Sequence, residues 1–349
     1  MRAFLLVLTL LAPLLAFGED ADPIQPYQPR FGREQPLVAV VGENRMTELV
    51  DFLVPFGLLS RANVAEVLAL STGDGPVQLM PALKVRAQAT TAEFERRYPQ
   101  GADYLIVPAV HHSDDPLLTA FVARQAAKGA TLVGICDGVL VLGHAGLLHG
   151  RRATGHWYSQ ARREADFPDT RWQVDRRYVA DGKLVTSSGV SAALPVSLAL
   201  VEAIAGPAKA ASLAREIGLG DWSPRHDSQA FAFGADGYLT AAGNYLAFWR
   251  HESLALPLQP DLDEATLALR ADAWARSWRT SVLATGSGPV RSLHGLTLLP
   301  DAAPASLAPL PGAEAAAGHA LDEALDGIAT RYGAGTAAFV ATQLEYPRN

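Results

Sequence analysis

The sequence predicts an α/β fold with a mostly parallel sheet, covered by helices on both faces, and a smaller α/β lobe after it. Two observations carry this prediction. Short apolar runs of strand length alternate with helix-length segments through residues 36–205, and this alternation is typical of parallel sheets between two layers of helices. Similar strand and turn patterns then recur after residue 250.

The first predicted elements are three strands and one helix. Apolar runs at 37–41, 67–70 and 104–108 have the length of buried strands. The segment 46–60 has the length of a helix but contains Pro55. Because proline lacks a backbone donor and clashes with the preceding turn, we expect a kink or break there.

The next elements continue the alternation. They are a helix at 117–128 closed by Gly129, a strand at 131–135, a helix at 137–148, a hairpin around Asp181-Gly182 and a helix at 192–205. We expect residues 36–205 to form one domain. Residues 206–250 then connect it to the second lobe and include a helix near 238–249.

The second lobe, residues 251–349, resembles a degenerate half-repeat of the first. The piece "VLALSTGDGPV" near the N-terminus corresponds to "VLATGSGPV" near the C-terminus, and a helix-like segment precedes each. Chance similarity is the alternative, because glycine–proline turns are common. The second copy has no cysteine and no acid in place of Asp51.

The N-terminus has the three parts of a secretory signal. A short cationic start precedes an apolar run from Ala3 to Phe17, and small residues then precede Glu19. We therefore expect a signal peptide at 1–18, a linker at 19–35 and a periplasmic or secreted protein. An uncleaved N-terminal membrane anchor is the alternative.

Charge and cysteine content restrict the partners. The formal net charge is −7, with 36 acidic residues against 29 Lys and Arg. An acidic chain without a basic stripe is a poor nucleic-acid ligand, so we expect none. We expect a small-molecule substrate or ligand, and the chain could form a homodimer. One cysteine, Cys136, excludes an intramolecular disulfide and indicates a thiol worth attention.

Cys136 stands where a predicted strand turns directly into a predicted helix. Such a turn exposes a nucleophile, and the helix N-terminus lowers the pKa of a thiol beside it. Gly138 fits a close approach by a ligand or another backbone segment. The alternative is a small buried apolar residue, which is a common role for a free cysteine.

The stretch "ATLVGICDGVLVLGHAGLLHGRRATGHW", followed by "RYVADGKLVTSSGVSAALPVSLALVEAI", resembles the ThiJ/PfpI superfamily of class I glutamine amidotransferase-like proteins. The resemblance covers roughly residues 36–205. It is greatest to isonitrile hydratases and to the ligand-binding lobes of AraC-type regulators. It implies a flavodoxin-like sandwich with the cysteine at the carboxyl ends of parallel strands, where such sheets bind ligands.

The resemblance also implies roles for two further residues. Asp51 lies four positions before Pro55, the spacing of an acid that pairs with the family's cysteine, and we expect it to carry a proton and donate to the sulfur. His156 corresponds to a histidine near the cysteine that could act as a base. A solvated helix face for Asp51, and a histidine satisfied within the fold for His156, are the alternatives.

Two departures from the family pattern bear on activity. Asp137 follows the cysteine where many family peptidases have histidine, which argues against a peptidase. The loop that usually reads Pro-Gly-Gly is Pro108-Ala109-Val110. The lost glycines put the usual amide donors of the oxyanion site in doubt. We expect Ala109, Val110, His111, Asp137 and Gly138 to line the binding site.

Other motifs carry less weight. The run "HHSDD" at 111–115 has metal-ligand residue types, but adjacent histidines rarely bind one ion together. The segment "GVSAA" imitates part of a serine-hydrolase elbow around Ser191. We expect neither a metal nor a cofactor.

Two functions remain open from the sequence. The first is an exported cysteine-dependent hydratase, hydrolase or lyase that acts on a small electrophile. The second is a non-catalytic ligand- or redox-sensing module without a DNA-binding domain, which would need a protein partner. Asp51, Cys136 and His156 favour the first function, and the altered oxyanion loop favours the second.

Overall fold

The computed structural model describes residues 23–347, apart from residue 305 and residues 313–314. The predicted signal peptide at 1–18 lies outside these residues. Within them, no helix has both the length and the apolar character needed to cross a membrane.

The central sheet has seven strands, of which all but one edge strand pair in parallel. Their spatial order is β11 (Tyr178–Asp181), β12 (Leu184–Ser187), β8 (Thr131–Gly134), β7 (Tyr104–Val107), β1 (Leu37–Gly42), β3 (Glu66–Ser71) and β6 (Ala89–Thr90). The antiparallel strand β11 joins β12 through the predicted Asp181-Gly182 turn, where Gly182 has a φ of 63°. This arrangement confirms the predicted α/β class with a mostly parallel, flavodoxin-like sheet.

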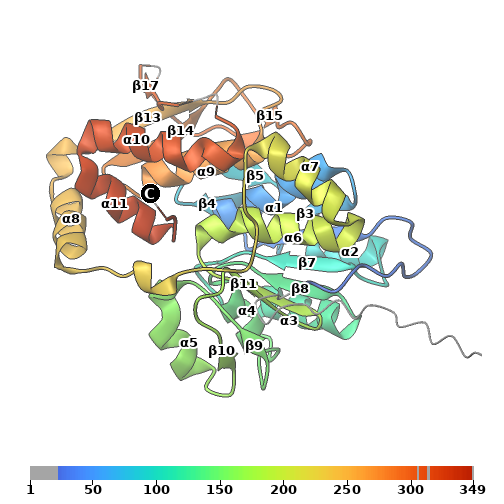
Figure 1. Ribbon diagram of the computed structural model, residues 1–349. Helices are drawn as coiled ribbons and strands as arrows, with labels where there is room; N and C mark the ends of the chain where they lie inside the picture. The colour runs from blue at the N-terminus through green and yellow to red at the C-terminus, as the bar shows by residue number, and fades with distance from the viewer. Residues whose placement is uncertain (1–22, 305, 313–314, 348–349) are drawn as a thin grey trace, which may run out of the picture.

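Helices cover both faces of this sheet (Figure 1). One face carries α1 (Leu49–Ala62), α6 (Ala193–Ala205) and α7 (Pro207–Ile217), and the other carries α2 (Thr91–Arg97), α3 (Pro116–Ala127) and α4 (Gly138–His144). Strand β1 alternates between the two layers. Val38 and Val40 pack in the first core, whereas Leu37, Ala39 and Val41 pack in the second.

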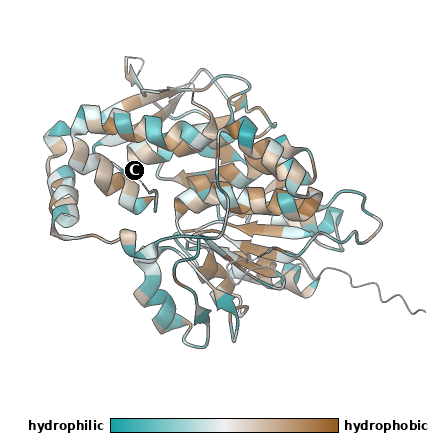
Figure 2. Ribbon diagram, viewed as in Figure 1, coloured by the Kyte–Doolittle hydropathy of each residue, from teal (hydrophilic) through white to brown (hydrophobic). Residues whose placement is uncertain are grey.

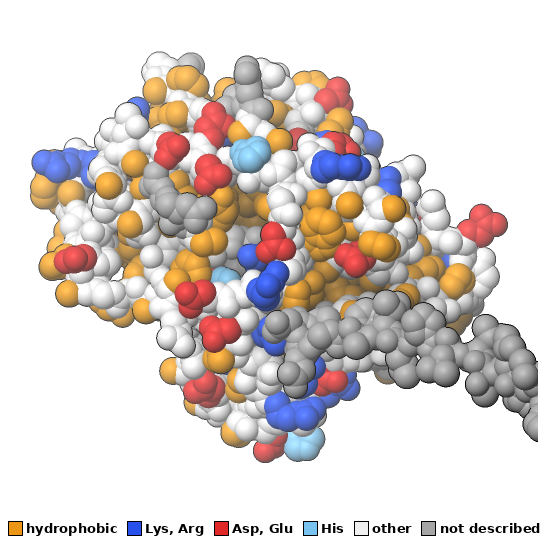
Figure 3. Space-filling view, in the orientation of Figure 1, with side chains coloured by type: hydrophobic (Ala, Val, Ile, Leu, Met, Phe, Trp, Pro, Cys, Tyr) orange, Lys and Arg blue, Asp and Glu red, His pale blue; other side chains and the backbone are white. Residues whose placement is uncertain are grey.

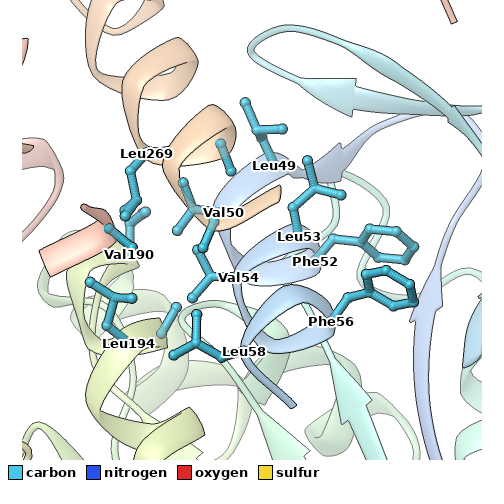
Figure 4. Close-up of a cluster of buried hydrophobic side chains, with 14 of the residues drawn as sticks. Leu49, Val50, Phe52, Leu53, Val54, Phe56, Leu58, Val190, Leu194 and Leu269 are labelled. Atoms are coloured by element: carbon cyan, nitrogen blue, oxygen red, sulfur yellow. The ribbon is translucent and has the colours of Figure 1, made fainter. Parts of the chain in front are cut away.

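Helix α1 is buried along most of its length, and its residues are largely apolar apart from Asp51, Ser60 and Arg61 (Figure 2). It continues through Pro55 as one helix, so a break there is wrong, and the alternative of a kink stays a prediction. Proline removes one hydrogen bond to the first turn, but the rest of the helix is packed between the sheet, α6 and the second lobe. Figure 4 shows Leu194 of α6 and Leu269 of the second lobe on the same side of α1 as Val54.

The C-terminal lobe is present as a second α/β unit. Its elements are β13 (Glu252–Pro257), α9 (Glu264–Ala275), β14 (Thr280–Thr285), β15 (Val290–Arg291), β16 (Thr297–Leu299), β17 (Ala308–Pro309), α10 (Ala320–Tyr332) and α11 (Ala334–Gln343). Strands β13 and β14 pair in parallel around α9, as β1 and β3 do around α1. The residue boundaries assigned to the domains stay predictions.

A second sheet joins the two lobes. It contains β2 (Thr47–Glu48), β4 (Val77–Met80) and β5 (Lys84–Arg86) from the first lobe and β15 and β16 from the second. The two lobes meet in this sheet where β5 pairs with β16, and these two strands run antiparallel. Hairpin β4–β5 of the first lobe therefore faces hairpin β15–β16 of the second.

The segments expected to be linkers pack against the domain. Residues 23–35 lack helix and strand, but Arg30 and Arg33 both form ion pairs with Asp103. The 206–250 stretch includes α7 and then α8 (Ala235–Leu246), which lies at the left edge of Figure 1. Large apolar side chains are exposed on and just after α8, and Figure 3 shows apolar surface at this edge.

Three further short elements lie between α4 and the hairpin. They are β9 (Arg152–Ala153), α5 (Gln160–Asp166) and β10 (Arg171–Trp172), and β9 pairs in parallel with β10. Together they place residues 154–163 beside the carboxyl end of the central sheet.

Candidate functional site

The candidate site lies at the carboxyl ends of the central strands. Asp51 follows β1, Ala109 follows β7, Cys136 follows β8 and Ser187 ends β12. Strand β1 lies between β7 and β3, and the chain builds the sheet outward on both sides of it, through β3 and β6 on one side and β7, β8 and β12 on the other. Open α/β sheets bind ligands at such a point. The structure therefore brings three of the predicted site residues, Asp51, Ala109 and Cys136, to one edge of the sheet.

Cys136 occupies a strained turn. Its φ is 55°, a left-handed value that non-glycine residues rarely adopt. The turn is closed by the amide of Gly138, which donates to the carbonyl of Ile135 at 2.7 Å. A Cβ atom on Gly138 would lie 2.0 Å from the carbonyl oxygen of Val107. The predicted close backbone approach at Gly138 is therefore real, and only glycine fits there.

The environment of the thiol differs from the prediction. Cys136 is buried, at 6 % exposure, rather than partly exposed. Burial raises the pKa of the Cys136 thiol well above its usual value, and the charges of Asp51, Asp137 and Glu48 raise it further. The start of α4 beside the sulfur does not offset burial and three acidic neighbours. The thiol is therefore protonated at neutral pH, and the expected low pKa is wrong.

Asp51 is fully buried in the first turn of α1. Its Oδ2 accepts a hydrogen bond from the amide of Ala109 at 3.0 Å. Within the described residues, Oδ1 has no hydrogen-bond partner. Burial raises the pKa of Asp51 to about 7, although the Ala109 amide lowers it.

Sequence reasoning missed a buried group of charges beside Asp51. Glu48 is the N-cap of α1, and its Oε2 accepts from the amide of Asp51 at 2.6 Å. Arg276 of the second lobe donates from Nη2 to Glu48 Oε1 at 2.8 Å and from Nε to Asp272 Oδ2 at 2.7 Å. Burial raises the pKa of Glu48, as do the charges of Asp51 and Asp272, and burial also raises the pKa of Asp272. Glutamate is not among the residues preferred at N-caps, so no sequence signal marked Glu48 as the start of the helix. Nothing in the sequence linked Arg276 to this site.

His156 does not serve the thiol in the predicted way. Its Nε2 donates to the carbonyl of Gln343 at 2.9 Å, and its Nδ1 accepts from the amide of Tyr158 at 3.2 Å. Both ring nitrogens are thus engaged, and neither is free to take the proton of Cys136. The histidine instead holds the C-terminal segment against the first domain.

Asp137 and the loop after β7 have structural partners. Asp137 Oδ1 accepts from the hydroxyl of Ser159 at 2.5 Å, and Arg163 donates to the same hydroxyl at 2.8 Å. The carbonyl of Ala109 accepts from the amide of Glu48 at 2.8 Å. The buried Val110 forms a bridge with Thr47, whereas the side chain of His111 is exposed. The Ala109 amide therefore supports Asp51 and is not free to stabilise an oxyanion.

The weaker motifs are also accounted for. Asp115 of the "HHSDD" run caps α3, where its carboxylate accepts from two backbone amides. The Ser191 hydroxyl donates to the carbonyl of Glu345 at 2.7 Å. In the second lobe Asp263, Glu264 and His294 place ligand-type atoms within 4.8 Å of one another. Arg61 pairs with Asp263 at 2.7 Å, and His294 contacts Glu264 at 2.6 Å, so these side chains have protein partners.

Comparison with known proteins identifies the family of the first domain. Residues 37–203 match the DJ-1/PfpI family. The chain is 30% identical over 163 residues to the HTH-type transcriptional regulator CdhR of Pseudomonas aeruginosa, which covers 46% of this chain and 47% of the regulator. It is 37% identical over 95 residues to isonitrile hydratase of Pseudomonas putida, which covers 27% of this chain and 40% of the hydratase. The matches thus span less than half the length of either relative.

Solved structures are also similar to the first domain. A DJ-1 superfamily protein from Salmonella typhimurium aligns with a TM-score of 0.47 at 25% identity, over 54% of this chain and 100% of that protein. An AraC family transcriptional regulator from Pseudomonas putida aligns with a TM-score of 0.46 at 21% identity, over 52% of this chain and 100% of that structure.

Proposed function

We propose, from the premise that this chain carries a DJ-1/PfpI family domain at residues 37–203, that it is a cysteine-dependent enzyme acting on a small, uncharged electrophile. One observation carries the proposal. Cys136 is held at a φ of 55° in a turn that only Gly138 permits, beside a buried carboxyl, Asp51, whose pKa is about 7. Strained cysteines beside a group that titrates near neutral pH are typical of catalytic sites.

Asp51 supplies the proton transfers that a protonated thiol requires. In its ionised form it accepts the Cys136 proton as the sulfur bonds to the electrophilic carbon. With an isonitrile, the protonated Asp51 then returns that proton to the same carbon, which gives a thioimidate. Water adds to this carbon and the sulfur leaves as the thiol, so the net reaction is hydration of the isonitrile to a formamide. A reactive carbonyl compound would enter by the same addition.

Burial of the site restricts the substrate class. An ionic substrate would have to lose its hydration to reach this site. The site has a low dielectric constant and already holds the buried carboxyls of Glu48, Asp51 and Asp272. A peptide would need open access to the sulfur, and Cys136 as a residue is only 6 % exposed. The protonated thiol also makes redox sensing unfavourable, because oxidation proceeds through the thiolate.

A second candidate function is non-catalytic ligand sensing. The observation in its favour is the amide of Ala109, which donates to Asp51 and so is unavailable as an oxyanion donor. Similarity to the regulator CdhR over 163 residues supports the same function. Reversible binding of a small ligand without turnover distinguishes it from the enzyme.

Export is part of the proposal. It is supported by the apolar run from Ala3 to Phe17 behind a cationic start. Expression of the full chain should give an extracytoplasmic protein that begins near Glu19. An intact N-terminus in the membrane fraction would favour an anchor instead.

The test of the enzyme is turnover and covalent capture. Purified protein is incubated with a small alkyl isonitrile, and separately with a small 1,2-dicarbonyl compound, and products are followed by mass spectrometry. We expect formamide or hydrated product, an adduct on Cys136, and loss of both in Cys136→Ser. Ser191→Ala is the matched control and should retain activity, because the Ser191 hydroxyl is engaged with the Glu345 carbonyl. Saturable binding without product or adduct would contradict the enzyme proposal and support non-catalytic ligand sensing.

A further inference from the structure

The two lobes meet through a pair of antiparallel helices with matching ion pairs at both ends. Helix α1 has Glu48 as its N-cap and Arg61 in its last turn. Helix α9 has Asp263 as its N-cap and Arg276 as its C-cap. Arg61 Nη2 lies 2.7 Å from Asp263 Oδ2, and Arg276 Nη2 lies 2.8 Å from Glu48 Oε1. Each arginine follows the N-cap acid of its own helix by thirteen positions. The contact therefore has approximate two-fold symmetry.

The two ends of this contact differ in chemistry. At one end Arg61 binds Asp263 and the exposed carboxylate of Glu216. At the other end Arg276 binds two buried carboxyls, Glu48 and Asp272, and Asp51 lies against Glu48. Cys136 is close enough that its thiolate would interact with the Arg276 guanidinium. Only one copy of the symmetric ion pair thus lies beside the thiol.

We propose that Arg276, supplied by the C-terminal lobe, is a positioning residue of the Cys136 site that fixes the charge and placement of the carboxyls beside the sulfur. The fork of its guanidinium joins the two lobes by binding Glu48 and Asp272 together, which a single-point cation does not reproduce. Because Glu48 in turn accepts from the Asp51 amide, the position of Asp51 depends on the same bond.

The charge balance around the thiol shows why this residue matters. The groups that face Asp51 and Cys136 are Glu48 on α1, Asp272 and Arg276 on α9, Asp137 before α4 and Arg163 on α5. Arg163 is engaged with Ser159 and the carbonyl of His156, on the Asp137 side. Arg276 is therefore the cation that offsets the three carboxyls Glu48, Asp51 and Asp272. Without it their ionised forms would oppose thiolate formation at Cys136 more strongly.

The experiment measures the pH dependence of alkylation at Cys136 in the full-length protein. Iodoacetamide is a small neutral reagent, and the chain has no other cysteine. We expect Arg276→Gln to move the alkylation profile to higher pH by at least about one unit. This corresponds to an alkylation rate about tenfold lower at pH 8. Arg276→Lys keeps the charge but cannot hold both carboxyls in a fork, so it should shift the profile in the same direction by less.

The symmetric residue provides the control. Arg61→Gln removes the same kind of ion pair from the same helix contact but faces no thiol, so its alkylation profile should match that of the unaltered protein. If Arg276→Gln does not fold, as judged by its melting transition, the proposal is tested by comparing the alkylation profiles of Arg276→Lys and Arg61→Gln. An unshifted profile in the folded Arg276 variants, or an equal shift in Arg61→Gln, would overturn the proposal.

The proposal rests on the proposed function only in taking the Cys136 sulfur as the reacting atom. Alkylation needs no turnover. If the isonitrile and dicarbonyl assays fail while the alkylation shift is found, the enzyme proposal falls and the role of Arg276 stands. If turnover is found without the shift, the enzyme proposal stands and the proposed role of Arg276 falls.

Discussion

Asp51 is a carboxyl that the fold keeps away from water, and this has a cost that depends on pH. Burial raises its pKa from 3.8 to about 7. Between these two values the folded protein holds a proton that the unfolded chain has already released. The stabilisation associated with this proton is fully present below about pH 4 and is lost as pH rises through about 7.

Asp51→Asn should therefore gain stability relative to the unaltered protein as pH rises. The amide cannot ionise, yet its oxygen can still accept from the Ala109 amide. Between pH 5 and pH 8 we expect the variant to gain about 2–3 kcal/mol of stability over the unaltered protein. Urea unfolding at the two pH values measures this. Asp166→Asn, at an exposed position of α5, should show no such trend. Parallel pH profiles for Asp51→Asn and the unaltered protein would contradict the burial argument.

The sequence predicted the turn at Cys136 and the burial of Asp51, but not the electrostatics around them. The strand–cysteine–helix pattern predicted the elbow, and an acid in "LVDFLVPF" predicted a buried Asp51, because both are local properties of the chain. The pKa of Cys136 was mispredicted because burial and three carboxyls outweigh a helix terminus. Those three carboxyls, of Asp51, Asp137 and Glu48, come from two segments nearly 90 residues apart. No local pattern places Asp272 and Arg276, which lie more than 200 residues beyond Glu48 in the chain, next to it. His156 was assigned to the thiol by resemblance, whereas its partner lies near the C-terminus.

Elements with strong apolar periodicity were predicted well. Strands β1, β3, β7 and β8 and helices α1, α3 and α6 lie within a few residues of their expected bounds. Helices α7, α10 and α11 were not predicted. Their sequences are rich in alanine, and α7 and α10 bury only one side, so they lack the long apolar runs that marked α1 and α6. Tertiary contacts hold such helices in place more than propensity does. The strand β5, which pairs with β16, also depends on a partner that lies far away in the sequence.

The end of α11 shows how a late element closes on the first domain. Glu345 follows this helix, is 1 % exposed, and accepts from the amides of Gly189 and Trp157. Its Oε2 also lies 3.5 Å from His226 Nε2. Burial alone would raise the pKa of Glu345, but His226, His156 and the two amides more than offset it, and the pKa is lowered to about 2.

Glu345→Gln should destabilise the protein at neutral pH and much less in acid. The lowered pKa means that the carboxylate contributes stability above about pH 4.5 and loses it as pH falls through about 2. We expect a loss of about 2–4 kcal/mol at pH 7 that shrinks by pH 3, measured by denaturant unfolding. Glu164→Gln, an exposed residue of α5 bonded to Gln160, should change stability little at either pH. An equal loss at both pH values would show that the charge of Glu345 is unimportant.

At the scale of the whole molecule the two lobes share one hydrophobic core. The cluster that contains Val38 and Phe52 of the first lobe continues through Trp274 and Leu325 of the second. Helix α1 lies at its centre, and a Cβ atom on Gly57 would come within 3.2 Å of the Cβ of Glu264 on α9. Lobes joined by a small polar interface unfold separately, whereas lobes that share a core lose their packing together.

We therefore expect a single cooperative unfolding transition in calorimetry, with the calorimetric and van't Hoff enthalpies in agreement. Gly57→Leu forces a side chain between α1 and α9, so it should lower the Tm of that one transition by several degrees without splitting it. Gly243→Leu is the matched control, because nothing lies within 4 Å of a Cβ atom at that position of α8, and its Tm should be nearly unchanged. Two separate transitions in the unaltered protein would mean that the lobes fold independently. Separate unfolding would also contradict a cysteine site whose arginine comes from the second lobe, because the site would then lose Arg276 before the first domain unfolds.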